Sequence, residues 1–271
     1  MTMRVFSSLP AFRGAIAELP ATVSAADSPE GAIVVLDGAR GWWDDAILAV
    51  AAGAAGILVN GPSPAPSTAL DRLIGIPTVL VRPLLRPDVA DDVIAAAKGA
   101  AGEITAPEGA AAAVVVECHA PTPALPGALR DALGWARIFA SAKLTLRMAT
   151  FSGGRGLALL DAGGAASVSV ILGASAGAPP AGRLRVTELG QTRRELEVDE
   201  GDVRFSVTDA SSRRLAPTRF ERPERLALRR LAAAIDARQL PEDLADYARD
   251  SALAEAILHA AADRRPESFT S

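Results

Sequence analysis

Short apolar segments alternate with amphipathic segments through the first hundred residues of the chain. Continuous apolar runs at 32–36, 56–59 and 78–81 predict three buried strands. Helical periodicity at 43–52, 67–73 and 88–98 predicts a helix after each of them. Strands that are apolar throughout and separated by helices are typical of a parallel sheet covered on both faces. We therefore expect a Rossmann-like α/β domain over residues 1–110.

The pattern changes after residue 110. A strand at 113–118 and a helix at 126–140 precede six strand candidates, at 144–151, 156–162, 165–172, 183–189, 193–198 and 203–208. Turns between them contain Gly153-Gly154, Gly163-Gly164 and Glu200-Gly201, as hairpins require. Two amphipathic helices, 223–238 and 243–262, and a tail at 264–271 complete the chain. We expect an α+β domain over 111–271 with a large, mainly antiparallel open sheet.

The first thirty residues contain only Val5-Phe6 and a helix-like stretch at 11–19 with Gly14. A dinucleotide site requires a strand, a Gly-x-Gly-x-x-Gly turn and an acidic residue after the second strand. A βαβ unit takes about 30 residues or more. We therefore expect the first such unit to be missing and the parallel sheet to be truncated.

Residues at the joints between elements carry a further pattern. The strand at 56–59 closes on Asn60-Gly61-Pro62, and the next strand closes on Val81-Arg82-Pro83. Gly127-Ala128-Leu129-Arg130-Asp131 is followed four residues later by Trp135. In order and spacing, residues 31–262 resemble the Gfo/Idh/MocA oxidoreductases. That family has Glu-Lys-Pro, Gly-Phe-Asn-x-Arg-Phe and Gly-x-Leu-x-Asp followed by His at these joints, and no motif is intact here.

The resemblance implies hydride transfer between NAD(P) and a sugar, with the family's Lys and His handling the proton of the substrate hydroxyl. Gly61 and Trp135 stand in those two positions, and neither side chain can hold or exchange that proton. Asp131 matches the family's Asp and is either a catalytic carboxylate or a helix-surface residue. We expect a degenerate member without a bound cofactor. The alternative is a divergent NAD(P)-dependent sugar or polyol dehydrogenase, or a non-redox enzyme for a sugar-like substrate.

The resemblance also implies protein partners, since family members associate through the large sheet. We expect a non-catalytic subunit that forms a homo-oligomer, or a hetero-oligomer with an intact family member.

Several other residues have two interpretations each. Arg82 and Arg86 follow a strand end, where they could hold an anion or form ordinary ion pairs. His119 could bind a ligand together with Trp135, or could simply be satisfied by a backbone partner. Trp42-Trp43 could stack on a ligand or fill the interior. Gly153-Gly154-Arg155-Gly156 resembles a phosphate loop, although its place between strands favours a hairpin turn.

Composition and charge argue against several classes of function. The net charge of −4, with arginines scattered among acidic residues, argues against nucleic-acid binding. No apolar stretch approaches the roughly 20 residues of a membrane span, and no secretory signal is evident. The single Cys118 excludes an intramolecular disulfide and agrees with a cytoplasmic location. With only His119 and His259 beside it, we expect no metal site.

Overall fold

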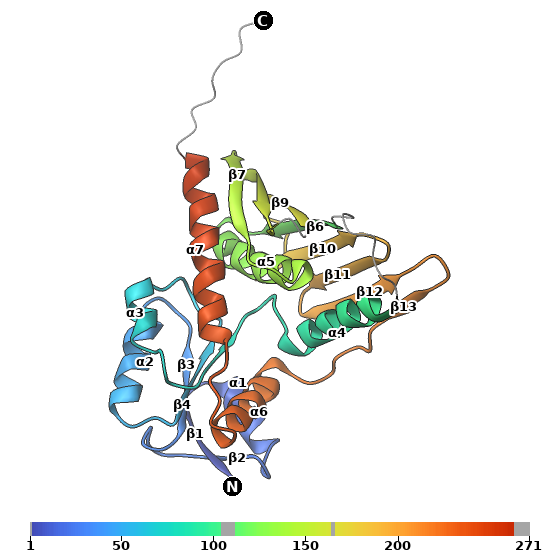
Figure 1. Cartoon of the computed structure of the whole chain (residues 1–271). Coiled ribbons are helices and arrows are strands. Elements are labelled where there is room, and N and C mark those ends of the chain that lie inside the picture. The colour runs from blue at the N-terminus through green and yellow to red at the C-terminus, as the bar shows by residue number, and fades with distance from the viewer. Residues whose placement is uncertain (1, 104–111, 164–165, 263–271) are drawn as a thin grey trace, which may run out of the picture. The chain divides into compact units, whose positions relative to one another are not determined.

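A computed structural model describes residues 2–103, 112–163 and 166–262 (Figure 1). The chain forms two compact units. Unit 1 contains residues 1–82 and 220–249, and unit 2 contains residues 83–219 and 250–271. The sequence placed a boundary near residue 110, whereas here the chain passes between units after Arg82 and returns at Phe220. The predicted tail at 264–271 lies outside the described residues.

Unit 1 is built on a five-stranded parallel sheet. Its strands are β1 (Met3–Ser7), β2 (Val23–Ala25), β3 (Ile33–Asp37), β4 (Gly56–Asn60) and β5 (Thr78–Val81), in the order β2-β1-β3-β4-β5. The helices are α1 (Pro10–Ala17), α2 (Trp42–Ala51), α3 (Ser67–Asp71), α6 (Pro223–Asp236) and the start of α7 (Asp243–Ala262). The predicted α/β class is confirmed.

The expectation that the first βαβ unit is missing is wrong. β1, α1 and β2 form it, and β1 pairs in parallel with both β2 and β3. The unit fits between residues 3 and 25 because α1 is short and β2 has only three residues. An acidic residue, Asp27, also follows β2, contrary to the sequence analysis.

The two faces of this sheet have separate cores. Phe12 and Ile16 of α1 and Leu228 and Leu231 of α6 pack on one face. Trp42 of α2, with Leu70 and Tyr247, packs on the other. Both faces are therefore buried, which explains why the strands are apolar throughout.

Unit 2 contains an eight-stranded sheet in the order β13-β12-β11-β10-β6-β9-β8-β7. The strands are β6 (Ala112–Ala120), β7 (Thr145–Ser152), β8 (Arg155–Asp161), β9 (Ala166–Ala174), β10 (Arg183–Leu189), β11 (Arg193–Asp199), β12 (Asp202–Thr208) and β13 (Arg213–Leu215). All neighbours are antiparallel except β6 and β9, so the predicted mainly antiparallel sheet is confirmed.

One face of this sheet packs on helix α5 (Leu125–Ala140), which follows a short 3₁₀ turn (Thr122–Ala124). Leu129, Leu133 and Phe139 of α5 meet Val116 and Val170 of the sheet. Helix α4 (Pro87–Glu103) adds Val89 and Val93 to the same core. In the part of the chain that the structure describes, no helix is long and apolar enough to cross a membrane.

Candidate functional site

The carboxyl ends of the parallel strands define the candidate ligand-binding region of unit 1. In the order β2-β1-β3, the chain leaves β1 toward one side of the sheet and places β3 on the other. Open α/β sheets bind ligands at such a switch point. Ser7 ends β1 and Asp37 ends β3, and Asp37 lies beside Asn60 of β4.

The turn from β1 into α1 consists of Ser8 and Leu9. The Leu9 N–H donates to Ser7 Oγ at 3.2 Å, and Pro10 at the start of the helix has no N–H. A pyrophosphate site in this fold depends on free backbone N–H groups at this turn. Two of the donors nearest the turn are thus absent or already used.

The loop after β4 is held by three contacts of unit 1. Ser63 O accepts hydrogen bonds from Trp42 Nε1 at 2.9 Å and from the Tyr247 hydroxyl at 2.6 Å. The Ser63 N–H donates to Gly38 O at 2.7 Å. A Cβ on Gly38 would lie 2.4 Å from the backbone carbon and oxygen of Gly61. The backbone of this loop is therefore fixed against the end of β3.

Gly61, which the sequence analysis assigned to the position of the family's lysine, stands in this loop. Its φ of +63° lies in the left-handed region, and its N–H donates to Val81 O at 2.9 Å. A side chain at this position would have open space but a strained backbone, at a cost of about 1 kcal/mol. The local conformation suits glycine.

Asp131 and Trp135 act together in unit 2. They lie one helical turn apart on α5, so they share a face. Asp131 Oδ2 accepts the Leu84 N–H at 3.0 Å, and Trp135 Nε1 donates to the Leu84 carbonyl at 2.7 Å. Both backbone groups of one residue are thereby satisfied by two side chains. We call this arrangement the Leu84 clamp.

The Leu84 clamp lies in the interior of unit 2. Trp135 is 0% exposed and Asp131 is 1% exposed. The Arg130 guanidinium, also buried, donates from Nε to Asp131 Oδ1 at 3.3 Å. Burial, and secondarily the charge of Asp131, raises the pKa of the Cys118 thiol to about 12. Asp131 is therefore not a helix-surface residue, and its carboxylate has structural partners.

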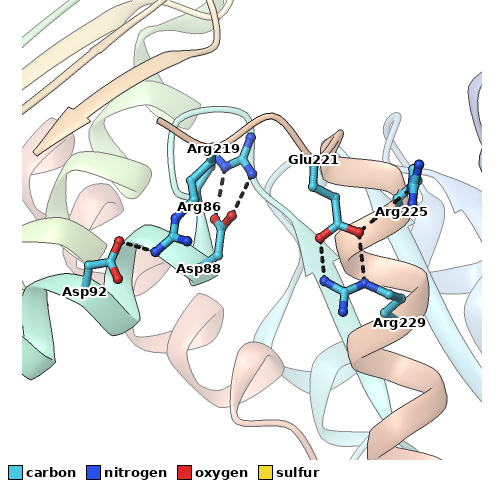
Figure 2. A network of polar contacts seen from close by, with 7 residues as sticks. All are labelled: Arg86, Asp88, Asp92, Arg219, Glu221, Arg225 and Arg229. Carbon is cyan, nitrogen blue, oxygen red and sulfur yellow. Dashed lines mark hydrogen bonds and ion pairs between the residues drawn. The ribbon is translucent and has the colours of Figure 1, made fainter. Parts of the chain in front are cut away.

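Arg82 and Arg86 have different settings. Arg82 follows β5 and is 7% exposed. Arg86 donates to both carboxylate oxygens of Asp88, at 3.0 and 2.7 Å (Figure 2). Burial raises the pKa of the Asp88 carboxyl, but the hydrogen bond and charge of Arg86, with the charge of Arg219, bring that pKa below its usual value. The ion-pair interpretation of Arg86 therefore has a direct structural counterpart.

Each unit has further ion pairs close in sequence to the point where the chain passes from Arg219 to Phe220. In unit 2, Arg219 donates to Asp92 on α4. In unit 1, Arg229 and Arg225 of α6 both pair with Glu221, which lies two residues before the helix (Figure 2).

The remaining candidates have structural settings. Trp42 is buried and packs edge-on against Tyr247, so it fills the interior. Gly153 and Gly154 form the β7–β8 hairpin turn, both with positive φ. His119 is half-buried on β6, on the face turned away from α5, and its ring lies over Gly173 of β9.

Several contacts have no signal in the sequence. Leu84 is 47 and 51 residues from its clamp partners, and Tyr247 is 184 residues from Ser63. Arg194 is buried against Phe139, with two nitrogens donating to the Val93 and Phe139 carbonyls at 3.1 Å. Only the acidic residue after β2, Asp27, could have been found, by treating residues 3–25 as a compact βαβ unit.

Comparison with known proteins places the fold. No family model and no curated protein sequence matches the chain. A UDP-N-acetylglucosamine 3-dehydrogenase from Acidithiobacillus ferrooxidans superposes with a TM-score of 0.67 and 14% identity, over 96% of this chain and 98% of that one. The chain has the fold of that enzyme. A 3-ketoreductase from Actinomadura kijaniata, solved with NADP, gives a TM-score of 0.63 and 14% identity over 96% and 98%.

Proposed function

We propose that this chain is a non-catalytic relative of the sugar oxidoreductases that share its fold, and that it acts through association with protein partners. The observation that carries the proposal is the Leu84 clamp, in which the polar atoms at the family's Asp and His positions bind the protein's own backbone.

The first step of catalysis that we propose this chain cannot perform is the transfer of the hydroxyl proton. Oxidation of a sugar hydroxyl by hydride transfer requires a group that takes the hydroxyl proton. Gly61 has no side chain, and the Trp135 indole has an N–H donor but no basic nitrogen. Asp131 keeps a carboxylate, but this group is buried and bound to Leu84 and Arg130.

The second step that we propose this chain cannot perform is the binding of a nicotinamide cofactor. The β1–α1 turn has no glycine, its Leu9 N–H is used by Ser7, and Pro10 has none to give. These features disfavour the close backbone approach that a dinucleotide pyrophosphate requires. We propose that the chain has no nicotinamide cofactor.

The single, buried thiol of Cys118 is compatible with the reducing cytoplasm, where we place the protein.

Association would use the face of the eight-stranded sheet that is turned away from α5, here called the outer face. Leu157, Leu159, Ile171 and Leu189 point to this face with exposed fractions between 37% and 49%. Large apolar residues gathered on one exposed face are typical of a protein interface. The partner is a second copy of the chain or an intact homologue that this chain stabilises.

The test compares association of the wild-type chain with that of two variants, by analytical ultracentrifugation alone and with a homologue that retains the lysine and histidine. Leu157→Asp on the outer face should weaken association at least tenfold, because it places a charge in an apolar contact. Leu48→Asp is the matched control, since Leu48 is 67% exposed on α2 of unit 1. A wild-type chain that stays monomeric under both conditions would contradict the proposal.

A second candidate function is a divergent NAD(P)-dependent oxidoreductase for a sugar-like substrate. The fold similarity supports it, since one structural neighbour is a sugar-nucleotide 3-dehydrogenase and another was solved with NADP. Asp27, in the position after β2 where this fold holds the cofactor ribose, also favours it. Substrate-dependent NADPH oxidation or NAD reduction, abolished by Asp27→Ala, would establish this alternative.

A further inference from the structure

Among the described residues, two arginines of the eight-stranded sheet have neither a carboxylate partner nor a hydrogen-bonded side chain. Arg155 opens β8 and Arg183 opens β10. The other strand arginines that bind carboxylates within 4.0 Å are Arg147, Arg185, Arg193, Arg194, Arg204 and Arg214. Arg213 hydrogen-bonds Ser206. Most strand arginines of the described sheet thus pair with a carboxylate; Arg213 binds only a hydroxyl, and Arg155 and Arg183 bind no side chain.

The two unpaired arginines lie in one row across the strands. Arg155 pairs with Gly173 of β9, Gly173 pairs with His119 of β6, and His119 pairs with Arg183. The inward residues of these strands, such as Val168 and Leu184, are buried in the core. The alternation of side chains therefore turns Arg155, His119 and Arg183 to the outer face together. We call this set the cationic row.

Gly173, which has no side chain, lies between Arg155 and His119 in the cationic row. A Cβ at this position would lie 2.5 Å from His119 Nδ1, so the imidazole lies flat over the glycine. The turn at Gly153-Gly154 fixes the start of β8 beside the end of β9, with the Ala174 N–H donating to Gly154 O at 2.6 Å. The row is therefore set on regular, well-paired backbone and has no side chain between Arg155 and the imidazole.

Asp199, Glu117 and Glu197 lie on the same face near the row, but none of them forms an ion pair within 4.0 Å with Arg155 or Arg183 among the described residues. Asp199 of β11 is the neighbour of Arg183 in the pairing, but no ion pair within 4.0 Å joins these described residues. Glu117 lies two residues before His119 and beside Arg185, which pairs with Glu195. On the Arg155 side, the neighbour on β7 is Ser152, which is uncharged.

We propose that the cationic row binds a diphosphate group on the outer face. Arg155 and Arg183 are three strand spacings apart, or roughly 14 Å between backbones. Arginine side chains reach roughly 6 Å each, so they can hold the two ends of an extended anion while His119 donates to its middle. A diphosphate matches this span and the forked geometry of two guanidinium groups, whereas a single phosphate reaches only part of the row.

The test is a titration of the full chain with inorganic diphosphate, orthophosphate and uridine diphosphate, followed by calorimetry and by the amide NMR signal of Gly173. We expect diphosphate to bind more tightly than orthophosphate and to shift the Gly173 signal. Arg155→Gln and Arg183→Gln should each weaken binding about fivefold, as the loss of one exposed charge pair predicts. Arg72→Gln is the control, because Arg72 is exposed on unit 1 and should leave the affinity unchanged.

Three results would overturn the proposal. The first is no saturable binding at all, and the second is a loss of affinity that is equal in all three variants. The third is a change of oligomeric mass in Arg155→Gln with diphosphate affinity unchanged, which would assign the row to contact with a second copy. Tighter binding of uridine diphosphate than of inorganic diphosphate supports the site and identifies a nucleotide as the source of the group. Because Arg155 lies on the same outer face as Leu157, the titration is repeated on Leu157→Asp, in which the proposed association is weakened, so that the site and the proposed function can fail separately.

Discussion

Trp135 has a structural role, because its side chain binds the protein's own backbone. By the resemblance stated above, its indole stands in the position expected for the family's histidine. The structure adds that this indole is fully buried and donates to the Leu84 carbonyl. Its neighbour one turn earlier, Asp131, completes the contact from the other side of the same peptide segment. The sequence showed which residues stand at these two positions. It did not show that both bind Leu84, because Leu84 is 47 and 51 residues away from them.

Replacing Trp135 by Phe tests the hydrogen-bonded half of the Leu84 clamp. The change keeps an aromatic ring in the core but leaves the Leu84 carbonyl without its donor. We expect the free energy of unfolding to fall by about 1–2 kcal/mol, measured by urea denaturation. Trp43→Phe is the control, because Trp43 is only half-buried, and it should change stability less. Equal losses in the two variants would show that the Leu84 contact contributes nothing specific.

Cys118 makes stability sensitive to alkaline pH. Burial raises the pKa of its thiol from 9.0 to about 12 in the folded chain. Between these values the unfolded thiol loses its proton while the folded thiol keeps it, so the unfolded state is favoured as pH rises. We expect the free energy of unfolding to fall by up to about 1.4 kcal/mol per pH unit above pH 9. Cys118→Ala should lack this component, and identical slopes in both proteins would contradict it.

At the scale of elements, hydrophobic periodicity predicted most helices and strands, because they are long or fully buried. The strand predicted at 78–81 matches β5, and the helix predicted at 126–140 matches α5 within one residue. The missed elements are short. β2 has three residues and a single buried side chain, and β13 is exposed throughout, so neither has a detectable period. The parallel pairing of β6 with β9 also depends on contacts far apart in sequence.

Gly38 tests whether the loop after β4 depends on close backbone packing. A methyl group at Gly38 would overlap the Gly61 backbone, which cannot shift without breaking the Ser63 contacts. We expect Gly38→Ala to destabilise the protein by about 3 kcal/mol. Gly14→Ala in α1 is the matched control. Nothing lies within 4 Å of its added carbon, and it should stabilise the helix by about 0.5–1 kcal/mol. Thermal unfolding measures both, and a neutral Gly38→Ala would refute the packing argument.

At the scale of the whole molecule, the chain has the fold of a sugar oxidoreductase, and we propose that the residues for its chemistry are replaced. Superposition extends over almost the entire chain at 14% identity. The fold depends on apolar periodicity and turns, which many sequences satisfy, whereas proton transfer depends on particular side chains. For this reason the sequence predicted the fold class, while the substituted positions stay a prediction. It gave no information on the Leu84 clamp or the cationic row, which arise only from the register of distant segments.

The most direct test of the non-catalytic account is titration of the purified chain with NADPH and NADH, followed by nicotinamide fluorescence and by calorimetry. The account predicts no saturable binding up to cofactor concentrations on the order of 1 mM, a ceiling that corresponds to weak association. Saturable binding with a dissociation constant in the micromolar range, lost in Asp27→Ala, would contradict it and would identify the chain as a dinucleotide-binding protein.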